Sequence, residues 1–295
     1  MRMRTIENVG IAIANGFTKN LDVSAITVFL AGGSLTSTNS IRPLLRKELR
    51  RHPYVRGFDV LYPEQLFDEL LLGKGRHDLL ELENMLAKST HAIIIIVESS
   101  GSIAELGAFV NSDALRPKVV AIIDKKHRSD RSFIMLGPVA TLRKIRREAV
   151  ITHDFKQLDP KKLAENIRRV TRLIVQDTTV NDTLNNPIRA QYFFLASIFV
   201  TQPVNSATLI KMLEATGECN AANTSMVGIT ALNMLIRQKD ATREANKYII
   251  SEQGSQRLSD IMESSRKKRQ LVQLFDKCRV DVLNVTLRKS KRRDM

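Results

Sequence analysis

The chain has few of the residues that bind metals or form disulfide bonds. Its 295 residues include 2 cysteines and 5 histidines, and the cysteines, Cys219 and Cys278, have no CxxC or Cys/His spacing. These numbers argue against a disulfide scaffold and against a metal site. The sequence also contains no histidine-rich cluster and no evident cysteine nucleophile that could serve in catalysis.

Long apolar runs are absent as well. No run of 18 apolar residues occurs, and residues 1–5 are not followed by the apolar core of a signal peptide. We therefore expect a cytoplasmic protein with no membrane partner. The length predicts two domains, and a hydrophobic content of 43% with 26% charged residues is ordinary for a globular protein.

Positive charge is in excess and is unevenly distributed. The chain carries 46 Lys and Arg against 31 Asp and Glu, a formal net charge of +15. Residues 266–295 alone contain 11 basic and 3 acidic residues, whereas residues 181–265 are close to neutral. A neutral module followed by a basic tail suits docking on a phosphate backbone, although a solvated tail that aids solubility has the same composition.

Five short apolar runs alternate with helical patterns over the first 180 residues. The runs cover residues 26–30, 58–62, 92–97, 119–124 and 149–152. Alternating strands and helices predict an α/β fold with a doubly wound parallel five-stranded sheet, flavodoxin-like in class. We expect the strand order 2-1-3-4-5.

The remaining chain reads as helical. After a polar segment at residues 177–187, three apolar helices are expected at 188–200, 206–216 and 223–237, followed by a hairpin within 239–253. This order predicts a winged helix-turn-helix-like domain. The third helix is poor in Arg and Lys before Arg237, so the module could bind protein, and an ordinary helical dimerisation domain stays open.

Four segments follow from these patterns. They are an N-terminal arm at 1–20, which reads as a short amphipathic helix broken near Gly16, an α/β domain at 21–180, a winged-helix-like domain at 181–265 and a basic C-terminal tail at 266–295.

The stretch from His91 to Val110 organises the α/β domain. Ala92–Val97 contains four consecutive isoleucines, which is typical of a parallel strand covered on both faces. A small polar loop and a helix follow, so the strand should end where ligands bind in open α/β sheets. Glu98 ends the strand, and Glu105 lies one turn into the helix.

Glu105 has a structural interpretation and a functional one. The spacing of Ser102 and Glu105 matches a capping box, in which both side chains satisfy the first turn of the helix. However, a capping box requires neither the preceding Ser-Ser-Gly nor a second carboxylate at Glu98. We therefore favour a functional carboxylate at Glu105, strengthened by apolar surroundings.

These residues carry a family resemblance. Residues 99–107, SSGSIAELG, resemble the glutamate motif of nucleoside 2-deoxyribosyltransferase-like proteins. The chain also resembles bacterial retron effector proteins, which join such a domain to a C-terminal winged-helix-like domain, in the order of Ala31-Gly-Gly-Ser34, Tyr62-Pro-Glu64, Leu82-Glu-Asn84 and the glutamate motif.

The resemblance implies a toxic effector of anti-phage defence. The family glutamate attacks the anomeric carbon of a nucleoside sugar, which here corresponds to Glu105. It further implies an N-glycosidase, with NAD as the leading substrate and no cofactor. Restraint by a retron reverse transcriptase and its msDNA, an RNA–DNA product, is implied too, and a homo-oligomer or filament is open.

The chemistry of an N-glycosidic bond suggests roles for the other residues. Nicotinamide leaves as a neutral base, so the main need is a carboxylate that stabilises the oxocarbenium ion. We expect substrate contacts from carboxylates, an amide and small residues at strand ends: Gly32, Gly33, Ser34, Glu64, Glu83, Asn84, Glu98, Ser99, Gly101 and Ser102. Glu98 or Glu64 would accept hydrogen bonds from ribose hydroxyls, and N–H groups of Gly32, Gly33, Gly101 and Ser102 would cradle phosphates.

Several of these assignments have alternatives. A tight turn explains the glycines at 32–33, and a solvated helix face explains Glu83 and Asn84. Deoxyribosyl hydrolysis or transfer on free nucleosides is an alternative activity. A non-catalytic nucleotide sensor with a DNA-binding regulatory module is an alternative of another class. Contacts to nucleic acid or a protein partner are expected from Arg266, Lys267, Lys268, Arg269, Arg288, Lys289, Lys291, Arg292 and Arg293.

Overall fold

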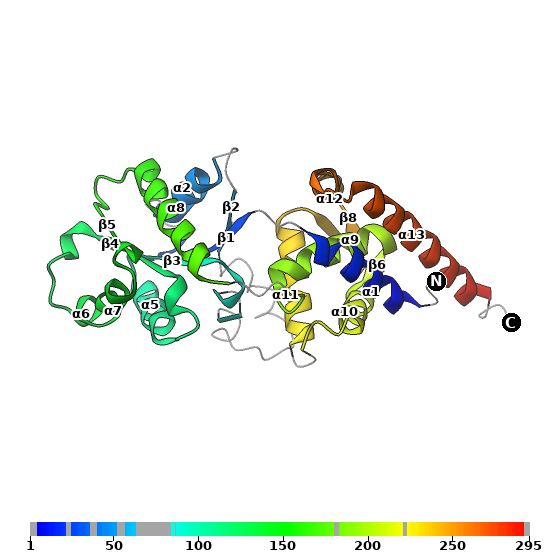
Figure 1. Ribbon diagram of the computed structural model, residues 1–295, viewed down its shortest axis with the longest axis horizontal. Coiled ribbons are helices and arrows are strands. Elements are labelled where there is room, and N and C mark those ends of the chain that lie inside the picture. The colour runs from blue at the N-terminus through cyan, green and yellow to red at the C-terminus, as the bar shows by residue number, and fades with distance from the viewer. Residues whose placement is uncertain are drawn as a thin grey trace. The chain divides into compact units, whose positions relative to one another are not determined.

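The computed structural model of the chain describes residues 5–21, 25–35, 40–51, 57–62, 84–85, 87–179, 183–220 and 223–291, with side chains as far as residue 285. Contacts divide these residues into two compact units (Figure 1). One contains the described residues from 25 to 179. The other joins residues 5–21 to residues 183–291.

The first unit is built on a five-stranded sheet. Its strands are β1 (Ile26–Ala31), β2 (Phe58–Leu61), β3 (Ala92–Val97), β4 (Val119–Asp124) and β5 (Val150–His153). All four pairings are parallel, and the spatial order is β2-β1-β3-β4-β5. The predicted α/β class, the parallel five-stranded sheet and the strand order are confirmed.

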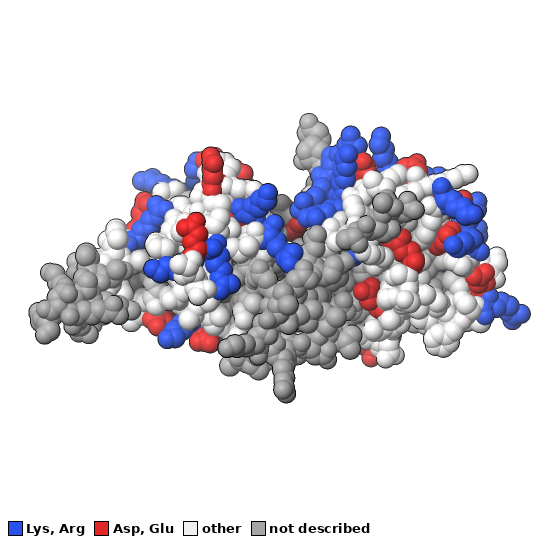
Figure 2. Space-filling model, turned by 180° about the vertical axis from the view of Figure 1, so that it is seen from behind, with Lys and Arg blue, Asp and Glu red and all other residues white. Residues whose placement is uncertain are grey.

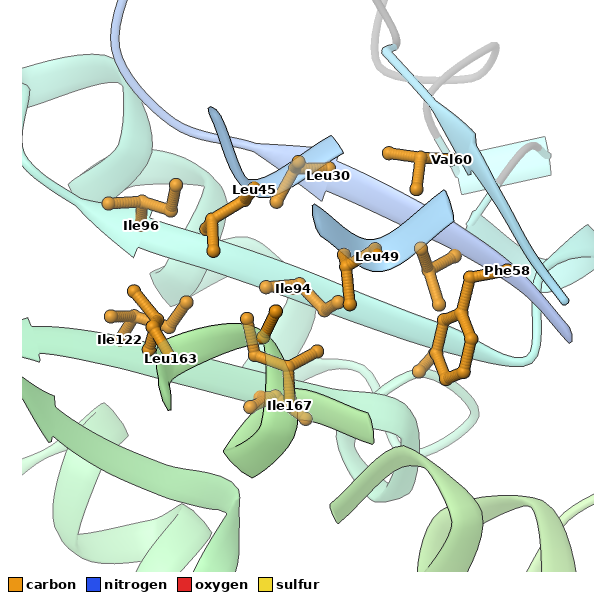
Figure 3. Packing of buried hydrophobic residues seen from close by; sticks show 14 of the residues in the cluster. Leu30, Leu45, Leu49, Phe58, Val60, Ile94, Ile96, Ile122, Leu163 and Ile167 are labelled. Atoms are coloured by element: carbon orange, nitrogen blue, oxygen red, sulfur yellow. The ribbon is translucent and has the colours of Figure 1, made fainter. Parts of the chain in front are cut away.

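Helices cover both faces of this sheet, which explains why its central strands are apolar throughout. On one face lie α2 (Ile41–Arg50) and α8 (Pro160–Asp177), and their leucines and isoleucines pack onto alternate residues of the strands (Figure 3). The other face packs against α5 (Ser100–Asn111) and α7 (Pro138–Ile145). There the Phe29 ring of β1 meets Phe109 of α5 edge-on at 5.7 Å. A strand buried on both faces needs no polar alternation.

Proline interrupts the chain between β4 and β5 as predicted. The short helix α6 (Phe133–Leu136) ends at Gly137, and Pro138 begins α7. Proline has no N–H to donate within a helix, but it suits the first turn of a new one.

The second unit combines three apolar helices with a small sheet. The helices are α9 (Pro187–Thr201), α10 (Ser206–Ala215) and α11 (Thr224–Arg237), and they match the three expected ranges closely. The strands β7 (Ala241–Glu244) and β8 (Lys247–Ile250) form the expected hairpin, and β6 (Val204–Asn205) pairs antiparallel with β8. The strand β6 was not predicted, because a two-residue strand has no readable period.

Two helices follow the hairpin, and the second of them lies in the segment expected as a basic tail. The first is α12 (Glu252–Ser264), which begins where Ser251 accepts a hydrogen bond from the Gly254 N–H at 2.9 Å. The second is α13 (Lys268–Lys291). Leu271, Phe275 and Cys278 are buried at helical spacing, so at least this part of the basic segment is docked rather than solvated.

The N-terminal helix belongs to this second unit. The helix α1 (Ile6–Gly16) ends near Gly16 as predicted, and it contacts α9, α10 and α13. Val9 and Ile13 are fully buried. A Cβ at Gly10 would lie 2.8 Å from the Met212 carbonyl oxygen, so glycine permits the close approach of α1 and α10.

Among the described helices, none combines the length and apolar character needed to cross a membrane. Over the same residues, no group of three or more His, Cys, Asp or Glu side chains is placed to hold a metal ion.

Candidate functional site

The carboxyl ends of β1, β2 and β3 bring polar residues together at one edge of the sheet. Gly32 and Gly33 follow β1, Tyr62 follows β2, and Glu98 follows β3. The Gly33 N–H donates to Glu98 Oε1 at 2.9 Å. Two segments 65 residues apart in sequence therefore meet at the edge where the sequence placed a ligand site.

The contact between Gly33 and Glu98 changes the expected role of the glycines. The Gly33 N–H was predicted to cradle a phosphate, but it donates to a carboxylate that a phosphate would have to displace. Gly32 is tightly enclosed, since a Cβ there would lie 3.2 Å from Arg42 Cδ and 3.3 Å from Glu98 Oε1. Glycine is needed here for close packing, while the Glu98 side chain stays exposed and oriented.

The first turn of α5 holds itself together without Glu105. Ser99 is the N-cap, and its side chain accepts from the Ser102 N–H at 3.2 Å. Ser102 Oγ in turn accepts from the Ser99 N–H at 3.0 Å, which completes a capping box between these two serines. The alternative in which Ser102 caps the helix and Glu105 is its partner is therefore wrong, because the N-cap, Ser99, lies three residues earlier.

Glu105 lies three residues beyond the capping box on the same side of α5. Ser102 and Leu106 are buried, and Glu105 itself is half-buried. A carboxylate in this position is partly removed from water, so its charge interacts more strongly with nearby groups. The capping role that offered a purely structural reason for Glu105 has been taken by Ser102.

Another carboxylate at this edge, Asp124, is committed to structure. It ends β4 and is 6% exposed. Its side chain accepts from the Lys126 N–H at 3.2 Å and lies 3.3 Å from the Lys126 ammonium. Burial raises the pKa of Asp124, but these contacts with Lys126 outweigh it and hold the pKa below its usual value. Asp124 therefore stays ionised and caps the turn that follows β4.

Sequence reasoning did not identify a cationic group beside the glycines. Arg42 is buried in α2 and donates to the Leu30 carbonyl oxygen at 3.2 Å. The guanidinium groups of Arg42 and Arg46 lie 5.3 and 4.9 Å from the centroid of the Tyr62 ring. The available signal was two arginines at i and i+4 after the Gly-Gly loop, together with a tyrosine at a strand end.

The remaining predicted substrate residues are placed less closely, or not at all. Ser34 and Gly101 are exposed. Asn84 lies in a helical stretch with an exposed side chain, as the solvated alternative would have it. Glu64 and Glu83 lie outside the described residues. A substrate role for these residues stays a prediction.

The predicted basic contacts begin between α12 and α13. Arg266, Lys267, Lys268 and Arg269 are all exposed. Lys267 donates to Asn20 Oδ1 at 2.7 Å, and Lys268 pairs with Glu263 at 2.8 Å. The structure describes side chains only as far as residue 285, which leaves out those of Arg288, Lys289, Lys291, Arg292 and Arg293.

Surface charge is not confined to this segment. On the face drawn in Figure 2, Lys and Arg gather most densely on the unit that contains the parallel sheet. On the other unit, basic and acidic side chains alternate. Positive surface therefore also lies outside residues 266–295, on the unit that contains the parallel sheet.

The α11 helix offers little to a nucleic-acid groove. It packs along α9 and α10, and most of its residues are buried. Of its described side chains, Ser225 and Arg237 are exposed. This distribution agrees with the scarcity of Arg and Lys that the sequence shows in this helix.

Comparison with known proteins supplies a family. Residues 38–242 match the family model described as STM3845 retron effector protein. The chain is 30% identical over 291 residues to an Escherichia coli protein named "Retron Ec86 putative ribosyltransferase/DNA-binding protein", covering 94% of this chain and 90% of that protein. Its counterpart from retron Ec73 of Escherichia coli is 40% identical over 91 residues, which are 30% of this chain and 29% of the relative. A family model that matches more than half of the chain, together with a relative aligned over most of its length, shows that this chain belongs to the STM3845 retron effector family.

Proposed function

We propose that the sheet-containing unit is an N-glycosidase that hydrolyses the bond between nicotinamide and ribose in NAD, with Glu105 as its catalytic carboxylate. The observation that carries this proposal is that Ser99 and Ser102 form the capping box of α5. Glu105, a half-buried carboxylate one turn further along the helix, is therefore not part of the cap. The names of the two relatives, which describe ribosyltransferases, support chemistry at a ribosyl carbon.

The mechanism uses the two carboxylates differently. Glu105 stabilises the oxocarbenium ion, or adds to the anomeric carbon, as nicotinamide departs as a neutral base. If an ester forms, water attacks the same carbon, releases ADP-ribose and restores the Glu105 carboxylate. Glu98, oriented by the Gly33 N–H at 2.9 Å, accepts hydrogen bonds from the ribose hydroxyls.

The second unit would hold the enzyme in check through a partner. The order α9, β6, α10, α11, β7, β8 resembles a winged helix-turn-helix, and the relatives' names include DNA binding. In this proposal the retron reverse transcriptase and its msDNA bind the unit and restrain a toxic activity. Because α11 is largely buried, we assign the phosphate contacts to the exposed residues Arg266–Arg269.

The test is nicotinamide release by the full-length protein, with and without its retron complex. Glu105→Gln keeps the shape of the side chain but removes its charge. We expect at least about a 1000-fold loss of turnover, as for other residues that stabilise transition-state charge, with an unchanged melting temperature. Glu165→Gln is the matched control, since Glu165 is an exposed carboxylate on α8.

The outcomes separate the candidate functions. No release by the wild type under either condition would overturn NAD hydrolysis. Cleavage of deoxyribonucleosides would then support the deoxyribosyl alternative, which the relatives' names also allow. Nucleotide binding without any turnover, unchanged in Glu105→Gln, would support a sensor.

A further inference from the structure

Tyr62 forms a platform for two arginines at the sheet edge. Its hydroxyl donates to the Arg42 carbonyl oxygen at 3.1 Å, which ties the ring to the first turn of α2. The Arg42 and Arg46 guanidinium groups both lie within 5.3 Å of the ring centroid. Stacking on an aromatic ring limits the rotamers of a guanidinium and orients its N–H groups.

The two arginines have different surroundings. Arg42 is 1% exposed and donates to Leu30 at the end of β1. It also lies beside Gly32 and Glu98, because a Cβ on Gly32 would touch both side chains. Arg42 is thus a structural cation that belongs to the carboxylate side of the site.

Arg46 differs from the two arginines at the end of α2, of which Arg50 is the last residue of the helix and Arg51 its C-cap. Arg50 pairs with Asp59 at 3.4 Å, and Arg51 pairs with Glu48 at 3.0 Å. Within the described part of the chain, Arg46 has no carboxylate partner, and its buried Nε has no hydrogen-bond acceptor. A half-buried guanidinium without a carboxylate partner gains strongly from an anion.

We propose that Arg46, stacked on Tyr62, binds a phosphate group of the substrate, so that the enzyme acts on nucleotides rather than on phosphate-free nucleosides. The inference rests on the proposed function and specifies the substrate class of the same site. Phosphate suits the planar guanidinium, which can donate two parallel hydrogen bonds to it.

The backbone makes this assignment stronger. The Gly33 N–H already donates to Glu98, and the Ser102 N–H already donates to Ser99 Oγ. Two of the four N–H groups expected to cradle phosphate are therefore occupied. An anion could bind to the Arg46 guanidinium beside Tyr62 without displacing a carboxylate, and Glu98, after β3, would remain for the sugar.

The experiment compares the binding of ADP-ribose and of adenosine to the full-length protein by calorimetry. Both are measured in the Glu105→Gln background, so that no turnover is needed. Arg46→Gln should weaken ADP-ribose binding about 10- to 100-fold, the range expected for losing a hydrogen bond between charged groups, and leave adenosine binding unchanged. Arg50→Gln is the matched control on the same helix, and it should change neither affinity.

Two further measurements keep the proposal falsifiable. Inorganic pyrophosphate should compete with ADP-ribose in the parent protein. Arg46→Lys keeps the positive charge but loses the planar guanidinium, so this competition should weaken in that variant, which provides the second test if Arg46→Gln fails to fold. Equal ADP-ribose affinity in Arg46→Gln and the parent, or the absence of pyrophosphate competition, would overturn the proposal. A failure of NAD hydrolysis would appear in nicotinamide release and not in these binding data, so the two failures are distinguishable.

Discussion

At the scale of single residues, the site depends on how closely side chains approach one glycine. Gly32 stands between Arg42, Ile96 and Glu98, with all three within 3.3 Å of where a Cβ would be. Its φ of +158° is also a conformation that residues with side chains rarely adopt. The cation and the carboxylate keep their spacing because this residue has no side chain.

Gly32→Ala should therefore separate Arg42 from Glu98. We expect overpacking to lower the free energy of unfolding by about 1–3 kcal/mol, and nicotinamide release to fall at least tenfold because Glu98 loses its position. Chemical denaturation and a turnover assay measure the two effects.

Gly107 provides the control for this substitution. It lies inside α5, and a Cβ there meets nothing within 4 Å. Gly107→Ala should be neutral or should stabilise by about 0.5–1 kcal/mol, since alanine is the better helix former. Equal effects of the two substitutions would contradict the close packing at Gly32.

At the scale of elements, α13 shows that a high content of charged residues can conceal a helix with one buried face. Its basic residues suggested a solvated tail, yet Leu271, Phe275 and Cys278 form a buried stripe. Phe275 packs against Phe17 at 5.3 Å and against Phe199 at 5.8 Å. The stripe was present in the sequence at a 4-3 spacing, but the number of charges concealed it.

The thiol of Cys278 reports the docking of α13. Burial, with a contribution from Asp281, raises the pKa of Cys278 to about 11. Because the thiolate is the reactive form, maleimide labelling of Cys278 should be much slower than that of half-buried Cys219 at pH 8. If Cys278 reacts while α13 stays docked, its labelling rate should continue to rise as the pH approaches 11, because the thiolate fraction rises.

Phe275→Ala should accelerate the labelling of Cys278 by freeing α13, while the rate at Cys219 stays the same. Mass spectrometry of timed samples resolves the two sites. Equal rates at both cysteines in the wild type would show that α13 is not stably docked.

At the scale of the whole molecule, the second unit is assembled from both ends of the chain. The helix α1 contacts α10 and α13, and Val9, Ile13 and Phe17 are almost completely buried. Each such side chain contributes about 1.5–3 kcal/mol on burial. The N-terminal helix is therefore part of the core of this unit.

Deletion of residues 1–21 should destabilise the second unit and spare the first. We expect hydrogen exchange to show lost protection in α9, α10 and α13, with protection kept in β3 and β4. The milder Ile13→Ala should lower the free energy of unfolding by about 2–5 kcal/mol, and Asn8→Ala, at an exposed position, should not. Unchanged protection after the deletion would contradict this assembly.

The parallel sheet, its strand order and the edge at which polar residues gather could all be predicted from the amino-acid sequence. These features follow from local patterns, such as the four isoleucines of β3 and the alternation of strands with helices. The pairing of side chains and backbone groups became evident only in the folded chain: Gly33 pairs with Glu98, Ser99 with Ser102, and Tyr62 with two arginines. Such pairings either join residues that are distant in sequence or depend on the residue at which a helix begins. The hydrophobic periodicity of the sequence contains neither kind of information. The same reason explains why α1 and α13 meet, since burial is a property of the folded chain rather than of any one segment.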